Sequence, residues 1–225
     1  IRHVPFIEGT IILLNMMKNK VVGHAAVAAL LLWAMSACNK SDDGITTQTH
    51  DANVFQQIMH ANMTQMNAMT MTGDPDHDFA MMMQMHHQGA IDMANQELKS
   101  GSDQTMKTMA QNIITAQTKE KAQFAQFLSS HQPTASEAGK SFDMMAMQDM
   151  DKMMKAQDTR ILTGNSDVDF TALMIDHHQS ALDMAQTELN YGKVETMRQM
   201  AQMIIEEQKT EISQFQDWLI KNKPY

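Results

Sequence analysis

Two copies of a motif that combines methionine with a pair of adjacent histidines are the chemically most distinctive feature of this sequence. Residues three, four and seven positions apart share one face of an α-helix, so each copy directs thioether and imidazole groups to the same side. Such soft ligands favour copper, Cu(I) above all and Cu(II) at histidine-rich positions, whereas zinc, magnesium and calcium prefer other donors. The predicted metal ligands are Met82, Met83, His86, His87 and Met93 in the first copy, and Met174, His177, His178 and Met184 in the second.

Other residues near the motif are weaker candidates. Asp92 and Asp183 each follow the second histidine of their copy by five residues, and both are predicted to hydrogen-bond an imidazole. The spacing fits two pseudo-symmetric sites, or one site between the copies. The possible secondary metal ligands are His60, Met63, His77, Met81 and Met85.

A packing role competes with metal binding for each single methionine, because methionine at helical spacing is an ordinary core residue. The chain contains 26 methionines, however, and the run at residues 81–85 spans most of a helix circumference. These side chains cannot all face one core, so some thioethers should be exposed or lie in secondary interfaces.

The two copies belong to a longer duplication with an offset of 91 residues. Asp78 matches Asp169, and Glu97 matches Glu188, without a gap. One supersecondary unit has therefore been duplicated, as repeat one (about 51–131) and repeat two (about 142–221).

The periodicity after residue 51 is helical throughout, which predicts an all-α domain over residues 51–225. Two long helix pairs can form an antiparallel four-helix bundle, and two further Met-rich helices should lie against it. The expected helices span about 52–71, 75–100, 103–130, 142–161, 167–190 and 193–221.

The first 37 residues differ in composition from the rest. Lys18 and Lys20 precede an apolar run over 21–34, which is typical of a secretory signal, with Met16 or Met17 as its start and residues 1–15 as an over-extended gene start. Cys38 ends a sequence that resembles a lipobox, so we expect it to carry lipid. Residues 38–50 would be a flexible tether.

The charge and the single cysteine exclude several functions. The formal charge is −9, and removal of residues 1–37 leaves 14 basic and 25 acidic residues, a formal −11. Such a chain repels phosphate backbones, so no nucleic-acid partner is expected. With only Cys38, no disulfide framework can form within the chain.

Residues 82–94 resemble the motif of the DUF305 family, in which a His-His pair is followed by Ala-Ile and Met-Ala. The family's downstream pattern resembles Ala116-Gln117 with Glu120 and, in the second copy, Glu211-Ile212 with Trp218-Leu219. The resemblance implies a ferritin-like four-helix bundle that is exported and, for Met-rich members, copper binding associated with copper tolerance. Leu173 and Ser180 replace Met82 and Gly89 of the first copy, which predicts a weaker second site.

The leading hypothesis is a non-enzymatic, periplasm-facing lipoprotein of the bacterial envelope. It would capture Cu(I) through exposed Met and His ligands, or hand it on to envelope copper transport proteins, with the lipid on Cys38 as its sole membrane contact. The alternatives are a helical interaction protein with a Met-rich surface and a haem-binding bundle. A di-iron oxidase is disfavoured because the chain contains no Glu-x-x-His motif.

Overall fold

The structure, a computed structural model, describes residues 47–222, and within this range it confirms the all-α prediction. The only strand-like pairing there is an isolated bridge between Gln48 and Leu162. A short 3-10 helix, η1 (His50–Ala52), precedes six α-helices. These are α1 (Val54–Asn67), α2 (Pro75–Ser100), α3 (Gln104–Ser130), α4 (Glu137–Asp158), α5 (Ser166–Tyr191) and α6 (Glu195–Lys221).

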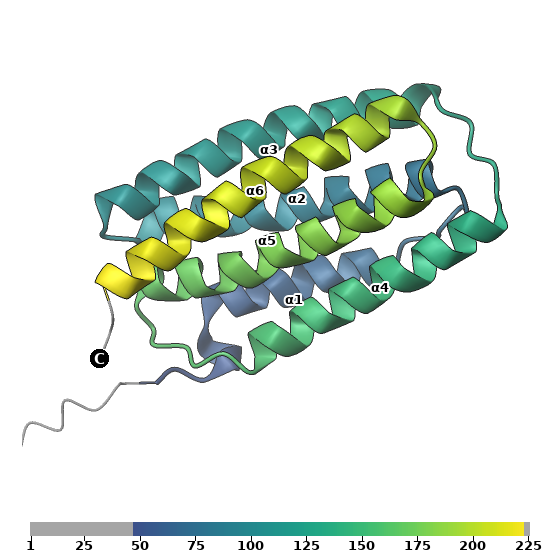
Figure 1. The fold of residues 1–225 in the computed structure, drawn as a ribbon. Helices are drawn as coiled ribbons and strands as arrows, with labels where there is room; N and C mark the ends of the chain where they lie inside the picture. The colour runs from purple at the N-terminus through teal and green to yellow at the C-terminus, as the bar shows by residue number, and fades with distance from the viewer. Residues whose placement is uncertain (1–46, 223–225) are drawn as a thin grey trace, which may run out of the picture. The chain divides into compact units, whose positions relative to one another are not determined.

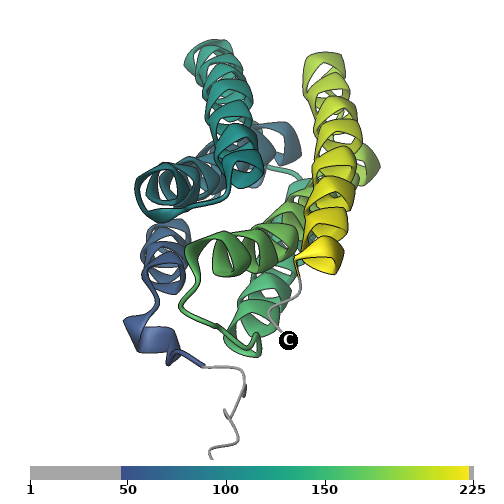
Figure 2. The ribbon, with the colours of Figure 1, turned by 90° about the vertical axis from the view of Figure 1, so that its left-hand side faces the viewer.

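The six helices form three layers of two (Figures 1 and 2). Helices α2 and α5 pack on each other in the central layer. On one side α3 packs along α2 and α6 along α5, which gives the antiparallel four-helix bundle, and on the other side α1 packs on α2 and α4 on α5. The Met-rich helices α1 and α4 thus lie against the bundle, as the sequence predicts, and α2 and α5 are covered on both sides.

The two repeats are tied together by a reciprocal exchange of helix caps. The carboxylate of Asp76 in repeat one accepts hydrogen bonds from the backbone N–H groups of Lys193 and Val194, at 3.0 and 2.7 Å, where α6 begins. At the equivalent place Asp167 of repeat two accepts from Ser102 and Asp103, both at 2.9 Å, where α3 begins. Each repeat therefore satisfies N–H groups that the other repeat's helix leaves without an intrahelical partner.

Local chemistry corrects the predicted end of the first helix. This helix was expected over 52–71, but α1 ends at Asn67. The backbone N–H groups of Thr72 and Gly73 donate to the Asp78 carboxylate at 2.9 and 2.7 Å. Gly73 has a φ of +77°, a conformation that favours glycine, so the chain leaves the helix and turns into α2.

The fourth helix begins earlier than predicted, at Glu137 rather than Phe142. Ser136 caps it by accepting a hydrogen bond from the N–H of Gly139 at 3.0 Å. Gly139 lies in the first turn of α4, where a Cβ would stand 1.7 Å from the carbonyl oxygen of Gly73. Its lack of a side chain lets α4 approach the turn between α1 and α2.

The predicted signal segment, the over-extended start and the lipidation site Cys38 lie outside the described residues. The end of the predicted tether does not: Gln48 N donates to Leu162 O at 2.7 Å, and His50 begins η1. The folded part therefore begins a few residues before Asp51. Within residues 47–222 no helix is both long enough and apolar enough to cross a membrane.

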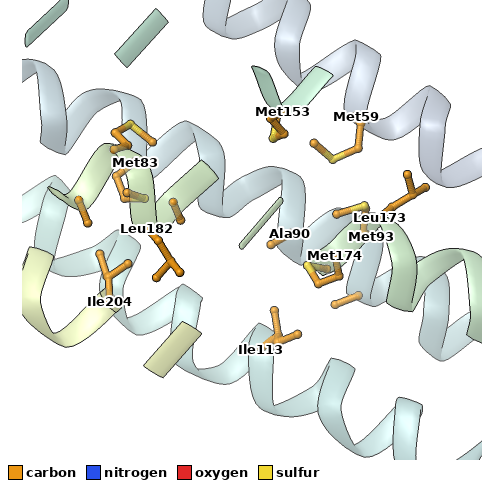
Figure 3. Packing of buried hydrophobic residues seen from close by; sticks show 14 of the residues in the cluster. Met59, Met83, Ala90, Met93, Ile113, Met153, Leu173, Met174, Leu182 and Ile204 are labelled. Atoms are coloured by element: carbon orange, nitrogen blue, oxygen red, sulfur yellow. The ribbon is translucent and has the colours of Figure 1, made fainter. Parts of the chain in front are cut away.

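Methionine supplies much of the buried core. In the view of Figure 3, Met93 and Met174 lie in one group with Leu173, and Met83 lies in another with Leu182 and Ile204. Met59 of α1 and Met153 of α4 form a third group. Thioethers from four helices are thus present inside the molecule, around its central layer.

Candidate metal centre

The first histidines of the two motifs meet at the centre of the molecule. The rings of His86 on α2 and His177 on α5 stack with centroids 3.7 Å apart and an interplanar angle of 30°. Both side chains are completely buried. Since the two residues occupy equivalent positions of the repeats, the contact lies where the pseudo-symmetric halves face each other.

The hydrogen bonds around this pair leave ring nitrogens without partners. Ser180 Oγ donates to the carbonyl of His177 at 2.7 Å, so it can accept from Nε2 of His86, which lies 2.8 Å away. Nδ1 of His86 and both ring nitrogens of His177 have no hydrogen-bond partner. Buried polar atoms are rarely unpaired, because each one costs free energy. Unprotonated ring nitrogens of this kind are metal ligands, so the pair fits a bound metal ion.

The second histidines of the motifs each face a glutamate of the following helix. Nε2 of His87 lies 2.7 Å from Oε2 of Glu120, and Nε2 of His178 lies at the same distance from Oε2 of Glu211. The contact at His178 also has the angles of a hydrogen bond. In both rings Nδ1 is buried and unpaired. A carboxylate at one imidazole nitrogen, with the other nitrogen free, is the arrangement that orients a histidine toward a metal.

Burial keeps the stacked pair uncharged. Desolvation, followed by the charges of His87 and His178, holds the pKa of His86 well below its usual range. Desolvation and the charges of His86, His178 and His87 do the same to the pKa of His177. Neutral imidazole is the form that binds metal, so no proton has to leave these rings at neutral pH.

The five predicted methionine ligands are buried, and none is exposed by more than 1%. The expectation that the protein presents exposed Met and His ligands is therefore wrong for this set. Methionine is apolar and flexible, and it fills irregular spaces in a core. This explains why the helices turn these side chains inward. The predicted methionine ligands all lie in the buried core: Met82, Met83, Met93, Met174 and Met184.

The sequence did not identify Met153 of α4 as a ligand candidate. Its sulfur lies 3.1 Å from Ser180 Oγ, and that hydroxyl lies 2.8 Å from Nε2 of His86. Met153 is 3% exposed. Glu120 and Glu211 were also not singled out as partners of the histidines, although they occupy equivalent positions in the two copies, a signal that could have identified them.

The prediction that Asp92 and Asp183 hydrogen-bond an imidazole is wrong in the described fold. Asp92 accepts from the side chain of Gln88 at 2.7 Å, and Asp183 accepts from Lys152 at 2.5 Å and from Gln179 at 2.9 Å. Asp92 is exposed and Asp183 is half-buried, and polar side chains on the same or a neighbouring helix take up both carboxylates. Glu120 and Glu211 fill the role instead.

The possible secondary ligands do not converge. His60 pairs with Asp158 at 3.0 Å, and its side chain is 46% exposed. His77 lies in the first turn of α2, and the centre of its ring is 6.0 Å from that of His131. His131 itself contacts Asp74 at 3.1 Å. The remaining candidates are half-buried: Met63, Met81 and Met85. Met63 and Met85 pack against the core from its edges.

No group of three or more His, Cys, Asp or Glu side chains within residues 47–222 is arranged to hold a metal ion by itself. A centre at the stacked pair would therefore need thioether sulfur to complete its ligands. Imidazole and thioether ligands together suit copper.

Comparison with known proteins identifies close structural relatives. The family model described as domain of unknown function (DUF305) matches residues 76–219. A DUF305 protein of Streptomyces coelicolor, whose description calls it secreted, is 24% identical with a TM-score of 0.54, over 66% of this chain and 94% of that one. CopM in its Cu(I)-bound form is 28% identical with a TM-score of 0.50, over 66% of this chain and 97% of that one. Among curated proteins, none matches this chain significantly.

Proposed function

Because the chain belongs to the DUF305 family, we propose that it is a copper-binding protein that holds copper ions through buried histidine and methionine side chains. The observation that carries the proposal is the stacked pair of His86 and His177, fully buried and with unpaired ring nitrogens. The Cu(I)-bound form of CopM, which shares the fold, supports the choice of metal.

The oxidation state follows from the ligand types. The unpaired nitrogens lie in a core whose other potential donors are thioether sulfurs. Thioethers bind Cu(I) more readily than Cu(II), and a buried site with few charges suits a monovalent ion. Cu(I) is therefore the favoured cargo, and Cu(II) would bind more weakly.

The protein acts without catalysing a reaction, as a periplasm-facing lipoprotein of the bacterial envelope. Sequence features support this setting: the secretory segment before Cys38 and the lipobox around it. The lipid on Cys38 would hold the folded part close to the membrane. There it would sequester copper or exchange it with envelope copper transport proteins, and so contribute to copper tolerance.

An anaerobic Cu(I) titration against a coloured competing chelator tests the proposal. The variant carries His86→Gln and His177→Gln, which keep polar side chains of similar size but remove the imidazole nitrogens. We expect the native protein to withdraw Cu(I) from the chelator. We expect the double variant to lose at least one equivalent, or to bind it about tenfold or more weakly.

The matched control carries His60→Gln and His131→Gln, which change the same number of histidines outside the centre. Circular dichroism establishes that all three proteins are folded. Retention of full copper binding by the double variant would show that the stacked pair is only a packing contact. Failure of the native protein to compete for Cu(I) would contradict the proposed function as a whole.

A further inference from the structure

A small pocket between α4 and α5 leads from the surface toward the stacked histidines. It has a volume of about 40 Å³, and three carboxylates line it: Asp149, Asp176 and Asp183. The pocket is also lined by Lys152 and Met153 of α4 and by Ser180 of α5. The pocket is too small for an organic ligand and large enough for a single ion or water molecule.

The inner wall of this pocket touches the candidate metal centre. Ser180 Oγ lies 3.1 Å from the sulfur of Met153 and 2.8 Å from Nε2 of His86. Behind His86 the ring of His177 is completely buried, and both of its nitrogens are unpaired. One hydroxyl group therefore separates the pocket from the imidazoles.

The outer wall carries excess negative charge. Asp176 is neutralised by Arg160, whose guanidinium donates to both carboxylate oxygens at 2.6 and 2.7 Å. For Asp149 and Asp183, by contrast, the one nearby cation within residues 47–222 is Lys152. The Lys152 side chain is 66% exposed, so water competes for this ammonium group and it can move away. A cation that replaced it would be attracted by two carboxylates.

The first repeat lacks these features at the equivalent positions. Ile58 and Ala61 occupy the places of Asp149 and Lys152, and Met85 occupies the place of Asp176. Asn62 replaces Met153 and lies directly against Gly89, where a Cβ would stand 3.0 Å from its side chain. Only Asp92, the counterpart of Asp183, keeps its charge. The duplicated fold thus built the acidic pocket in repeat two and not in repeat one.

We propose that copper ions enter the protein through this pocket, drawn in by Asp149 and Asp183 and passed to the Met153 sulfur as the first soft ligand before they reach His86 and His177. This inference rests on the proposed function, because it assigns the route to the same centre. The carboxylates raise the local concentration of cations at the mouth of the pocket. Thioether sulfur then binds the ion in preference to carboxylate oxygen, which directs it inward.

The test compares the rate of copper uptake with the amount bound at equilibrium, in the full chain. Stopped-flow absorbance follows the transfer of Cu(I) from the coloured chelator. We expect Asp183→Asn to slow the transfer about threefold at low salt, and the effect to shrink as salt screens the charge. Ala156→Leu, which adds bulk to the pocket wall, should slow it as well. The amount bound at equilibrium should stay that of the native protein.

The duplication supplies a matched control for each variant. Asp92→Asn removes the same charge at the equivalent position of repeat one, and Gln65→Leu adds a leucine at the counterpart of Ala156. Both should leave the rate unchanged. Equal rates for Asp183→Asn and Asp92→Asn would overturn the entry route while the proposed function stands. If the native protein binds no copper at equilibrium, the proposed function fails and the route with it.

Discussion

The stacked imidazoles of His86 and His177 combine two properties that oppose each other in most proteins. They are fully buried, and they are polar groups in which three of the four ring nitrogens lack hydrogen-bond partners. Such an arrangement destabilises a fold unless a ligand uses it, since each unpaired buried group costs about 1–3 kcal/mol. The residues are thus better explained by metal binding than by packing.

The stability of the metal-free protein should fall in mild acid because of this pair. Burial lowers both pKa values in the folded state, whereas the unfolded imidazoles keep a value near 6.5. Below about pH 6.5 the unfolded state binds more protons, so stability present above that pH is lost as the pH falls. Each ring contributes a slope of up to about 1.4 kcal/mol per pH unit. Urea unfolding between about pH 7 and pH 5, with a chelator present, measures it.

The variant with His86→Gln and His177→Gln should show a shallower decline over the same pH range, because it has lost the two groups that take up protons on unfolding. The variant with His60→Gln is the control, because it changes one exposed histidine and leaves the stacked pair intact. Parallel declines for the native protein and the first variant would mean that the stacked rings are already charged in the folded state.

The sequence identified the residues of the centre better than their contacts. The repeated His-His pairs and their flanking methionines were recognisable from residue type and spacing, and all of them lie in the interior. Which histidine stacks on which, and that Glu120 and Glu211 face the second histidines, depends on how α2, α3, α5 and α6 pack. Spacing along one helix carries no information about a partner on another helix.

At the scale of the helices, α2 and α5 each end in a buried glutamate that packs against a glycine. Glu97 and Glu188 are completely buried in the last turns, directly over Gly101 and Gly192, where a Cβ would stand 2.0 Å from a carboxyl oxygen. Each glutamate lies beside the aspartate of the other repeat that caps the next helix. Burial and Asp167 raise the pKa of Glu97 to about 8, and burial and Asp76 raise that of Glu188 to about 10.

These raised values make the fold sensitive to alkaline pH. Between the unfolded value of 4.5 and the folded value of about 10, the folded protein holds a proton on Glu188 that the unfolded chain releases. Stability is therefore highest at low pH for this group and declines as the pH rises, by up to about 1.4 kcal/mol per pH unit. Arg198 opposes the effect and reduces it.

Glu188→Gln should flatten this decline, because the amide mimics the protonated carboxyl group and does not titrate. We expect the variant to be more stable than the native protein at about pH 9 and closer to it at about pH 6. Thermal unfolding at both pH values measures the difference. The control is Glu195→Gln, at an exposed residue of the same region. Equal stability of native and Glu188→Gln proteins at alkaline pH would show that Glu188 is already ionised.

Helix identities and the layer of each helix were largely predictable, but several helix ends were not. The periodicity indicated six helices, and glycine, proline and aspartate indicated their approximate limits. After α1 ends at Asn67, the chain turns into α2 with the N–H groups of Thr72 and Gly73 held by the carboxylate of Asp78. The early start of α4 depends on Gly139 fitting against Gly73. Both are tertiary effects that a local pattern cannot contain.

At the scale of the whole molecule, the two repeats lie together in one compact unit. Asp76 and Asp167 cap helices of the opposite repeat, and His86 and His177 stack across the boundary between repeats. A single repeat would leave these carboxylates, N–H groups and rings without partners. The two halves should consequently unfold together.

Unfolding by urea tests this coupling. The described part has one tryptophan, Trp218 on α6, whose fluorescence reports on repeat two. Far-UV circular dichroism reports on all helices. With Trp33 changed to phenylalanine, the two signals should give the same midpoint. Asp76→Asn, in repeat one, weakens the cap of α6 and should lower the unfolding free energy by about 1–3 kcal/mol. Both midpoints should therefore fall by the same amount. Asp51→Asn, at an exposed residue, should change neither. In the native protein, different midpoints for fluorescence and dichroism would show that the repeats are independent folding units. In the Asp76→Asn variant, a shift confined to one signal would show that the exchanged caps do not couple the repeats.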